Sequence, residues 1–469
     1  EMIGYEGGLK LINFFAVHNI DFNKAWKAKQ SGWHDQTRAI FANAEIGWKS
    51  MIYLTATGRN DWDSRLAFSD YKSFFYPSIG LSAILTSMFN APDWLTYLKV
   101  RGSYTEVGNS YGRFMTTVTY PYDEQTQSWT STSSYPNTKL KPERTKSWEV
   151  GLDARILNDI SLNLTYYRSN TYNQTFYADL SLSSGYSNIP IQSGNIMNEG
   201  LEMSLGYNKQ WKDFSFNTNY TLTWNKNRVK RLADGVYNYA TGQPIQMPEL
   251  SPLTYGHTDA RLILRVGGSM GDVYGQRLLK RDLNGYILNE EGVGLAMENK
   301  ETYLGSILPK MNMGWSLGFG YKGVNLGMTF TGRFGGIVIS ETQSVLDAAG
   351  VSKVSADVRD AGGVQINQSK VSAQTYYQTI QGTAAYYTYS ATNVRLGELS
   401  LSYTLPKKWF DNKVGMTVGL VGKNLWMIYC KAPFDPELTT SAASNFYQGF
   451  DAYMLPSTRN FGFNVKFQF

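Results

Sequence analysis

Arg459–Phe469, with the sequence RNFGFNVKFQF, closes the chain and decides its fold. From Phe461 onward every second residue is apolar, and the residues between are Gly, Asn, Lys and Gln. A period of two places the apolar side chains on one face of a β-strand, and about ten residues let a tilted strand cross a bilayer. An edge strand of a soluble β-sandwich shows the same alternation, but an exposed row of phenylalanines would promote aggregation in water. We therefore interpret the stretch as one strand of a membrane β-barrel.

The same alternation recurs along the chain. Ile160–Tyr166, Leu201–Tyr207, Phe214–Trp224 and Val414–Leu420 are each largely apolar at one parity and polar or glycine at the other. An all-β, transmembrane antiparallel barrel with thirteen or fourteen strands in this chain follows. The predicted strands are 36–48, 50–58, 74–88, 96–106, 145–156, 160–170, 199–210, 214–226, 311–321, 324–334, 392–404, 414–424 and 459–469, with a weaker candidate at 9–18.

The connections between these strands alternate between short and long. Short turns are predicted at Lys49-Ser50, Asn158-Asp159, Trp211–Asp213 and Lys322-Gly323, where the residue types accept turn geometry. The long connections run roughly over 107–144, 171–198, 227–309, 335–391 and 425–458. Outer-membrane barrels keep short turns on the periplasmic side and long loops outside, whereas a soluble sandwich has no reason to separate them. The last strand then ends in the periplasm.

The composition supports one large β-architecture over residues 1–469. Counts of 44 Gly, 33 Tyr, 23 Phe and 12 Trp with 17% charged residues describe a turn-rich, aromatic-rich chain. No run of eighteen apolar residues occurs, which excludes transmembrane helices, and the mean hydropathy of −0.34 suits a barrel with a polar inner face. Six tryptophans lie near predicted strand ends, as an interfacial girdle requires: Trp48, Trp148, Trp211, Trp224, Trp315 and Trp409.

Several chemistries find no support in the residues. Cys430 is the single cysteine, so no internal disulfide forms, and His18, His34 and His257 are too scattered for a metal site. A net charge of +6 on 469 residues does not indicate nucleic acid. No catalytic triad spacing or phosphate-binding glycine loop is found, so we expect a protein that is not an enzyme and carries no cofactor. Asp282–Gly285 faintly resembles a calcium loop, but a surface turn is the better interpretation.

Several segments resemble the barrel of the SusC/RagA-type TonB-dependent outer-membrane transporters. They are Gly58–Trp62, Phe75–Ser82, Leu98–Tyr104, Val107–Asn109, Leu140–Glu143, Ser147–Gly151, Gly194–Glu202, Val394–Leu396, Leu401–Pro406, Gly422–Trp426 and Phe434–Glu437. These segments occur in order over most of residues 36–469. The resemblance implies a plugged, 22-stranded barrel of a Gram-negative outer membrane, of which this chain supplies the C-terminal strands. The family's plug domain, TonB box and first strands have no counterpart in it, as expected of a fragment or of a cleaved protein.

The resemblance also implies a function. Such a transporter imports a large solute, oligosaccharide ahead of oligopeptide, with a SusD-like surface lipoprotein as lid and with energy delivered by the TonB complex acting on the plug. Lipid and lipopolysaccharide would surround its outer face. Two other readings stay open: a passive porin, which needs no plug, and a structural surface barrel, which has no solute path.

Substrate would then be held at the extracellular mouth by aromatic side chains of the long loops. Aromatic faces stack on sugars and pack on peptides, while hydroxyls add hydrogen bonds. The candidate contacts are Trp129, Tyr135, Tyr237, Tyr239, Tyr376, Tyr377, Tyr386 and Tyr387. The alternative for each is packing within the loops. Loop 335–391, with a short helix near Glu341–Ala349, is a candidate for lid docking, and Asn424 with Phe434–Glu437 is expected to fix the base of the last long loop.

Overall fold

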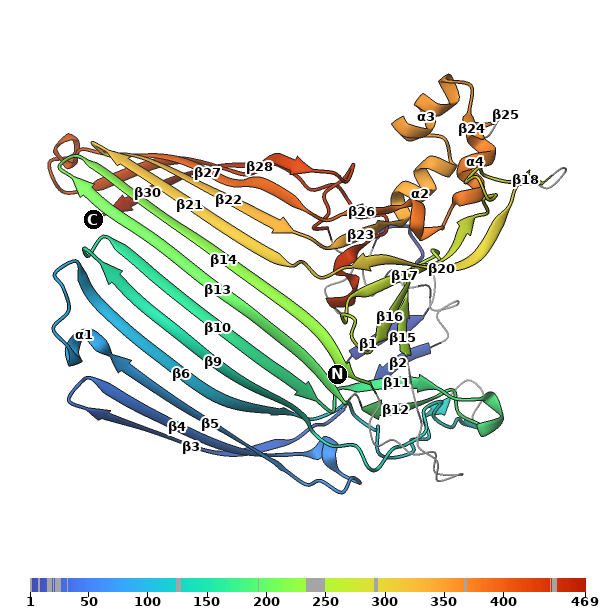
Figure 1. The fold of residues 1–469 in the computed structure, drawn as a ribbon, viewed down its shortest axis with the longest axis horizontal. Coiled ribbons are helices and arrows are strands. Elements are labelled where there is room, and N and C mark those ends of the chain that lie inside the picture. Colours follow the sequence, from blue (N-terminus) through green and yellow to red (C-terminus); the bar gives the residue numbers. More distant parts are fainter. Residues whose placement is uncertain are drawn as a thin grey trace.

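A computed structural model gives the architecture of the chain (Figure 1). It describes residues 2–6, 9–14, 19, 21, 27–31, 33–123, 128–192, 194–232, 249–290, 294–366, 369–438, 440 and 445–469. Its main element is a 13-stranded antiparallel sheet in strictly sequential order. The strands are β3 (Thr37–Trp48), β4 (Ile52–Asp63), β5 (Phe74–Ile84), β6 (Leu95–Asn109), β9 (Glu143–Ile156), β10 (Ile160–Tyr172), β13 (Asn195–Trp211), β14 (Phe214–Arg231), β21 (Met311–Tyr321), β22 (Val324–Phe334), β27 (Asn393–Leu405), β28 (Gly415–Cys430) and β30 (Asn460–Gln468).

Each of the thirteen strands overlaps one predicted range, so the strand prediction is confirmed. The weaker candidate at 9–18 is wrong in its described part, because residues 11–13 form a turn and residues 15–18 lie outside the described residues. Asn19 explains the turn: its amide accepts from the Leu11 backbone N–H at 3.0 Å and donates to the Leu11 carbonyl at 2.8 Å. A side chain that satisfies the backbone in this way competes with strand pairing.

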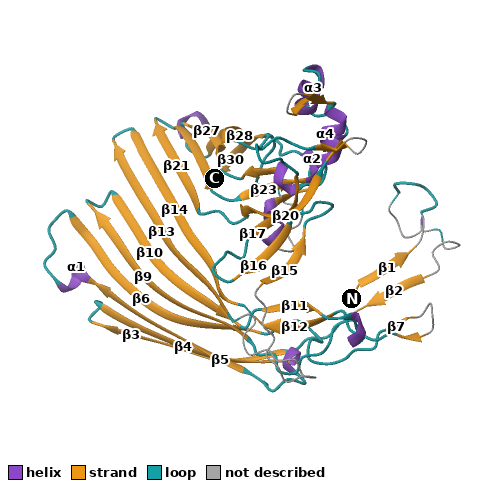
Figure 2. Ribbon diagram, turned by 45° about the vertical axis from the view of Figure 1, so that its right-hand side comes forward, coloured by secondary structure: helices purple, strands orange, loops and turns teal. Residues whose placement is uncertain are grey.

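The sheet forms a curved wall that is open in the structure, with β3 and β30 as its two edges (Figure 2). The hairpin turns lie at one end of the wall and the long connections at the other (Figure 1). Lys49 and Ser50 have φ of 49° and 55°, and Lys322 and Gly323 have 46° and 90°. Two successive positive φ values match the right-handed twist of the flanking strands, so the short turns are confirmed. Two further connections at this end contain α1 (Leu85–Met88) and η5 (Lys407–Phe410).

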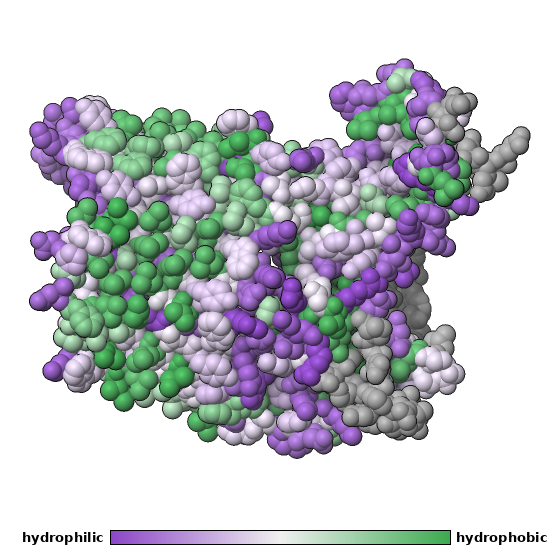
Figure 3. All heavy atoms as spheres, viewed as in Figure 1, coloured by the Kyte–Doolittle hydropathy of each residue, from purple (hydrophilic) through white to green (hydrophobic). Residues whose placement is uncertain are grey.

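The two faces of the wall differ in polarity, as the alternation predicts. Phe463 pairs with Leu420 and Leu420 with Leu401, so apolar residues of neighbouring strands share the outer face. Their side chains are largely exposed, and Phe461 and Phe463 are each 79% exposed. Figure 3 shows apolar side chains over the wall, with hydrophilic ones at its turn end and towards its loop end. Such a band fits hydrocarbon and not water.

The long connections fold into a loop layer of small sheets and helices. A four-stranded sheet holds β15 (Glu249–Thr254), β16 (Arg261–Arg265), β17 (Asp272–Leu279) and β20 (Met297–Ser306), and a three-stranded sheet holds β26 (Thr388–Ser390), β23 (Ile337–Ser340) and β29 (Phe450–Asp451). Two-stranded pairs are β1 (Met2–Glu6) with β2 (Lys27–Ser31), β7 (Tyr122–Asp123) with β8 (Ser128–Trp129), β11 (Thr175–Asp179) with β12 (Asn188–Gln192), β18 (Asn289–Glu290) with β19 (Gly294–Leu295), and β24 (Val364–Ile366) with β25 (Ser369–Val371).

Three helices complete this layer: α2 (Glu341–Ala348), α3 (Lys353–Asp360) and α4 (Ala373–Ile380). The predicted helix near Glu341 is thereby confirmed. Each begins after a serine whose hydroxyl accepts a backbone N–H of the first turn, and Ser340 accepts from Gln343 at 2.9 Å. Short 3₁₀ turns are η2 (Ser64–Leu66), η3 (Leu182–Ser184), η4 (Ala384–Tyr386) and η6 (Asn445–Gly449). In the described part of the chain, every helix is too short or too polar to span a membrane.

The buried cores of the described residues lie in the loop layer and at the loop ends of wall strands. One core joins Tyr255, Leu262, Ile307, Ile339 and Phe450, which come from three different long connections. Each of these residues is at most 3% exposed. Burial of this apolar surface offsets the conformational entropy lost in ordering long loops, so the loops form a folded layer above the wall.

Candidate functional site

A pocket of the loop layer lies where β14 continues past the start of β21. Trp224 is the last β14 residue paired with β21, so the edge of β14 from Asn225 to Arg228 faces the loop layer instead of a neighbouring strand. The pocket has a volume of about 780 Å³ and is closed on its other sides by residues 267–272, 303–310 and 335–337. This size is typical of sites that hold a small organic ligand.

Asn227 fixes one wall of this pocket. Its side-chain oxygen Oδ1 accepts from the Met270 backbone N–H at 2.8 Å, and its side-chain Nδ2 donates to Oδ1 of Asn198 on β13 at 2.9 Å. The backbone of Val229 adds two hydrogen bonds of 2.8 Å, to the carbonyl of Gly268 and from the N–H of Gly267. The loop sheet is therefore attached directly to the end of the wall.

Asp272 and Tyr303 form a hydrogen-bonded pair in the lining of the pocket. The Tyr303 hydroxyl donates to Asp272 Oδ1 at 3.1 Å, and the Ser269 backbone N–H donates to Oδ2 at 2.8 Å. Asp272 is only 6% exposed, and burial raises the pKa of its carboxyl above the ordinary value despite these hydrogen bonds. Burial and the neighbouring carboxylate raise the pKa of Tyr303 to about 12, so this hydroxyl remains a donor at neutral pH.

The Tyr303 ring itself is open to solvent. It is 56% exposed and lies 5.3 Å from the ring of Tyr274, centroid to centroid. Arg265 stacks its guanidinium on Tyr274 at 4.5 Å and forms ion pairs with Glu249 at 2.6 Å and Glu301 at 2.7 Å. The arrangement presents two fixed aromatic rings beside a pocket, with Asp272 holding the hydroxyl of one of them.

Below the loop layer, the inner face of the wall carries a polar network. Arg101 on β6 donates to Asp153 on β9 at 2.7 Å and to Thr165 on β10 at 2.6 Å, and Asn163 donates to the other oxygen of Asp153. The Arg101 side chain lies across Gly151, where an added Cβ would come within 2.6 Å of Nε. The inner face of the wall is therefore polar at β6, β9 and β10.

Four of the predicted contact residues form a core of the loop layer. Tyr376 and Tyr377 lie on α4 and belong to the same cluster as Tyr386 and Tyr387; Tyr377 is 6% exposed and Tyr387 is 2% exposed. The Tyr386 hydroxyl accepts the backbone N–H of Leu279 at 3.1 Å. The rings of Tyr377 and Tyr387 are thus covered by the chain itself.

Trp129 and Tyr135 lie apart from that core. Trp129 is 69% exposed on the β7–β8 hairpin, with its ring 5.0 Å from Tyr122. Tyr135 is partly buried against the core around Ile191 and meets Tyr186 edge-on at 5.1 Å. Tyr237 and Tyr239 lie outside the described residues. Trp129 therefore remains a predicted contact residue with an available surface, at a different place from the pocket.

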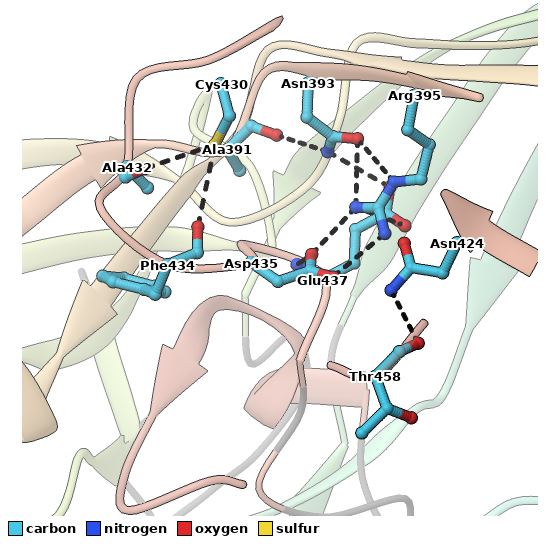
Figure 4. Close-up of polar contacts among 10 residues, drawn as sticks. All are labelled: Ala391, Asn393, Arg395, Asn424, Cys430, Ala432, Phe434, Asp435, Glu437 and Thr458. Atoms are coloured by element: carbon cyan, nitrogen blue, oxygen red, sulfur yellow. Dashed lines mark hydrogen bonds and ion pairs between the residues drawn. The ribbon is translucent and has the colours of Figure 1, made fainter. Parts of the chain in front are cut away.

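The base of the last long loop is fixed by a buried ion pair, as expected for Phe434–Glu437 (Figure 4). Arg395 on β27 donates to both oxygens of Asp435, at 3.0 and 2.8 Å, and reaches Glu437 at 3.2 Å. Burial alone would raise the pKa of Asp435, but the hydrogen bonds from Arg395 hold it below its ordinary value. Asn424 donates to the Thr458 carbonyl at 3.2 Å and holds the other end of the loop.

The structure also bears on two minor predictions. The Asp282 carboxylate accepts the backbone N–H groups of Asn284 and Tyr286, both at 2.9 Å, which is a surface turn held by its own side chain. No cluster of three or more His, Cys, Asp or Glu that could hold a metal occurs among the residues that the structure describes. The Cys430 thiol contacts the carbonyls of Ala432 and Phe434.

The sequence interpretation missed Asp272 and Tyr303. A lone carboxylate and a tyrosine thirty-one positions apart show no motif spacing. One local signal was present: Gly267, Gly268 and Gly271 surround Ser269 and precede Asp272, and such a glycine-rich turn allows close approach of the backbone to the β14 edge.

Comparisons with known proteins agree with this architecture. A family model described as TonB dependent receptor-like, beta-barrel, matches residues 14–425. The TonB-dependent receptor P3 of Formosa agariphila is 25% identical over 92% of this chain and 45% of its own length. The TonB-dependent receptor SusC of Bacteroides thetaiotaomicron is 25% identical over 46% of this chain and 19% of its own length.

A solved structure of the RagAB peptide importer in its open-open state has the same fold, with a TM-score of 0.71 at 20% identity over 95% of this chain and 48% of that chain. The chain spans about half the length of the curated relatives that it matches over most of its residues. The resemblance to SusC/RagA-type proteins is confirmed. The chain belongs to the TonB-dependent receptor-like β-barrel family, whose members are receptors and transporters of the outer membrane.

Proposed function

We propose that the protein containing this chain imports a large solute across the outer membrane of a Gram-negative bacterium, with energy delivered through TonB. One observation carries the proposal: the long connections gather at one end of a wall whose inner face is polar, and they frame the pocket at Asp272 and Tyr303. A solute held there has a hydrophilic path along the wall. Because the energy would come from TonB, the wall itself needs no nucleotide site or catalytic group.

The chemistry of the pocket favours an oligosaccharide over an oligopeptide. The exposed Tyr303 ring, fixed by Tyr274 behind it and by Asp272 at its hydroxyl, offers a flat face for the C–H groups of a sugar. Asn225 and Lys226 on the β14 edge add donors for sugar hydroxyls. Trp129 on its hairpin would be a second, peripheral contact. A peptide cargo, such as RagAB imports, is the alternative outcome of the test.

The test measures binding of oligosaccharide and oligopeptide pools to the full-length protein by calorimetry, with native protein, Tyr303→Ala and Tyr303→Phe. Loss of one stacked ring is expected to weaken binding roughly tenfold, whereas Phe keeps the ring and should stay within about threefold of the native protein. Tyr286→Ala is the matched control, since Tyr286 is 49% exposed on a turn that does not line the pocket. Equal binding by native protein and Tyr303→Ala would refute this pocket as the solute site.

Transport itself is tested by uptake in cells with and without TonB. Active import predicts that uptake of the bound solute stops when TonB is removed. Uptake that continues unchanged identifies the passive porin, and no uptake in either strain identifies a structural surface barrel. The coupling would act through a plug supplied by the part of the protein that this chain does not span, seated against the polar network at Arg101 and Asp153.

The lid of this importer would be a SusD-like surface lipoprotein docked on α2–α4. This segment projects from the loop layer (Figure 1) and exposes Leu346, Val351 and Val354 at 39%, 69% and 52%. Apolar side chains at the tip of a projecting segment suit a protein contact. Val351→Ser with Val354→Ser should weaken co-purification of the lipoprotein, while Val266→Ser, which is 59% exposed on another loop, should not. Unchanged co-purification would count against this docking surface.

A further inference from the structure

A second pocket, called the rim pocket below, lies at the loop end of β5, β9 and β10. It is separate from the pocket at Asp272 and Tyr303, which is called the solute pocket. The rim pocket has a volume of about 610 Å³. Its lining combines three cationic side chains with aromatic ones: Lys141, Arg144, Lys146, Tyr71, Phe75 and Tyr172. None of these residues belongs to the solute pocket or to the polar inner network.

The strand register places two cations of this rim pocket, Arg144 and Lys146, on the outer face of the wall. Val150, Trp148, Lys146 and Arg144 alternate along β9 and therefore share one face, and Val150 and Trp148 are 57% and 40% exposed there. Moving towards the loop end, the outer face thus changes from aliphatic to aromatic to cationic. At about 3.4 Å per residue, Arg144 lies roughly 14 Å beyond Trp148 along the strand.

The neighbouring strands add further aromatic and cationic side chains at the levels of Trp148 and Arg144, although not in the same order. Tyr104 on β6 pairs with Trp148, and Tyr172 on β10 pairs with Arg144. Arg168 on β10 pairs with Trp148 from the other side, so a further cation lies level with the aromatic row. Figure 3 shows hydrophilic side chains replacing apolar ones on this face where β9–β14 approach the loops.

The charges in the rim pocket are not balanced. Arg144 donates to Glu106 at 3.0 Å and to the Phe75 carbonyl at 2.9 Å, and Lys146 lies 3.4 Å from the same carboxylate. Glu106 thus pairs with two cations, and Lys141 is a third cation in the lining of the pocket. Three cations and one carboxylate carry a net charge of +2. These two hydrogen bonds occupy two of the five N–H donors of Arg144, and its side chain is 38% exposed.

The backbone of Lys141 is also held in place. Its N–H donates to the side-chain oxygen of Gln192 at 2.9 Å, and the Gln192 amide donates back to the Lys141 carbonyl. The cationic end groups are therefore carried on a fixed frame above the aromatic row. A phosphate oxygen is the acceptor that suits such a set of guanidinium and ammonium donors.

We propose that the rim pocket binds the phosphate of a phosphorylated glycolipid in the outer leaflet, whose acyl chains lie along the apolar outer face beside Trp148. This proposal rests on the outer-membrane family of the chain and is independent of the cargo. The cationic end of β9 would set the depth of the wall in the membrane, because the phosphate and the aromatic row fix two levels of the same lipid.

The test measures binding to the delipidated full-length protein by native mass spectrometry with three probes: bisphosphorylated lipid A, dephosphorylated lipid A, and inorganic phosphate. Native protein should retain bisphosphorylated lipid A. Lys141→Gln with Lys146→Gln should weaken this binding roughly tenfold to thirtyfold, since each cation near a charged headgroup contributes a comparable electrostatic term. Lys407→Gln with Lys408→Gln removes two exposed lysines at the turn end and should leave binding unchanged.

Equal binding of bisphosphorylated and dephosphorylated lipid A would overturn the proposal, as would unchanged binding by the double variant. Inorganic phosphate that binds as tightly as bisphosphorylated lipid A would assign the pocket to a free anion and also overturn it. If the double variant fails to fold, Lys141→Gln alone decides, because the structure gives its side chain no ion pair with a described residue. Solute binding should be normal in these variants, which separates this test from that of the cargo.

Discussion

The ion pair between Arg395 and Asp435 gives the sharpest quantitative prediction. Both side chains are largely buried, 11% and 8% exposed, and two hydrogen bonds join them at the base of the last long loop. Removing one partner of a buried pair leaves an uncompensated charge and costs about 3–5 kcal/mol. Because Glu437 remains 3.2 Å from Arg395 in Asp435→Ala, we expect the lower figure, about 3 kcal/mol.

Hydrogen exchange of the full-length protein measures this cost directly. A loss of about 3 kcal/mol in the free energy of local opening corresponds to roughly 100-fold faster exchange of the backbone amides in residues 431–438. The matched control is Asp357→Ala on α3. Asp357 is 63% exposed, and its partner Lys353 is 85% exposed. An exposed pair of this kind is worth about 0.3–0.5 kcal/mol, so exchange near α3 should change about twofold.

Two further measurements separate the mechanism from a general loss of stability. Replacing both partners, Arg395→Met with Asp435→Leu, should cost less than the sum of the single replacements, since no buried charge is left alone. The pKa of Asp435 lies below its ordinary value, so its stabilisation is complete at neutral pH and is lost only as pH falls through the folded pKa. The reasoning would be refuted if the backbone amides of residues 431–438 in Asp435→Ala exchanged at a rate within twofold of the native rate.

Three other predictions follow from single contacts. Gly151→Val should displace Arg101 from Asp153 and cost about 1–3 kcal/mol in denaturant unfolding, because an added Cβ would lie within 2.6 Å of Arg101 Nε; unchanged stability would show that Arg101 moves freely. Tyr387→Phe should leave the thermal midpoint unchanged or raise it, since the buried hydroxyl has no hydrogen-bond partner among the described residues; a marked fall would reveal a missing acceptor. Phe463→Lys on the outer face should cost about 2–4 kcal/mol of folding into vesicles, and Asn464→Lys on the inner face much less; equal costs would contradict the assignment of faces.

The wall could be predicted from the sequence because its information is local. Each strand carries its own period of two, and each short turn carries residues such as Lys49-Ser50 or Lys322-Gly323 that accept positive φ. Each wall strand pairs with the wall strand that comes before or after it along the chain, so the strand order contains no crossover. The candidate at 9–18 lacks this regular period, and the Asn19 side chain forms the hydrogen bonds of the Leu11 backbone that a partner strand would otherwise form.

The loop layer could not be predicted because burial there depends on segments far apart in the sequence. Tyr387 and Tyr303 are both loop tyrosines, yet one is 2% exposed and the other 56%. The difference arises because α4 covers the first, whereas β17 and the end of β14 leave the second beside a pocket. Composition favoured aromatic contacts in the loops, and tertiary packing decided which of them remain accessible.

The three-stranded sheet of the loop layer has a consequence for how such a protein can change its specificity. β23 and β29 belong to different long loops, yet Ile339 pairs with Phe450, and the Tyr453 N–H donates to Thr342 at 2.7 Å. From a third loop, the Tyr255 hydroxyl donates to the Phe446 carbonyl at 2.7 Å. Exchanging one loop alone would leave the others without these partners. A change of specificity therefore requires these three loops to change together. A chimera between relatives should fold when all three loops come from the same parent.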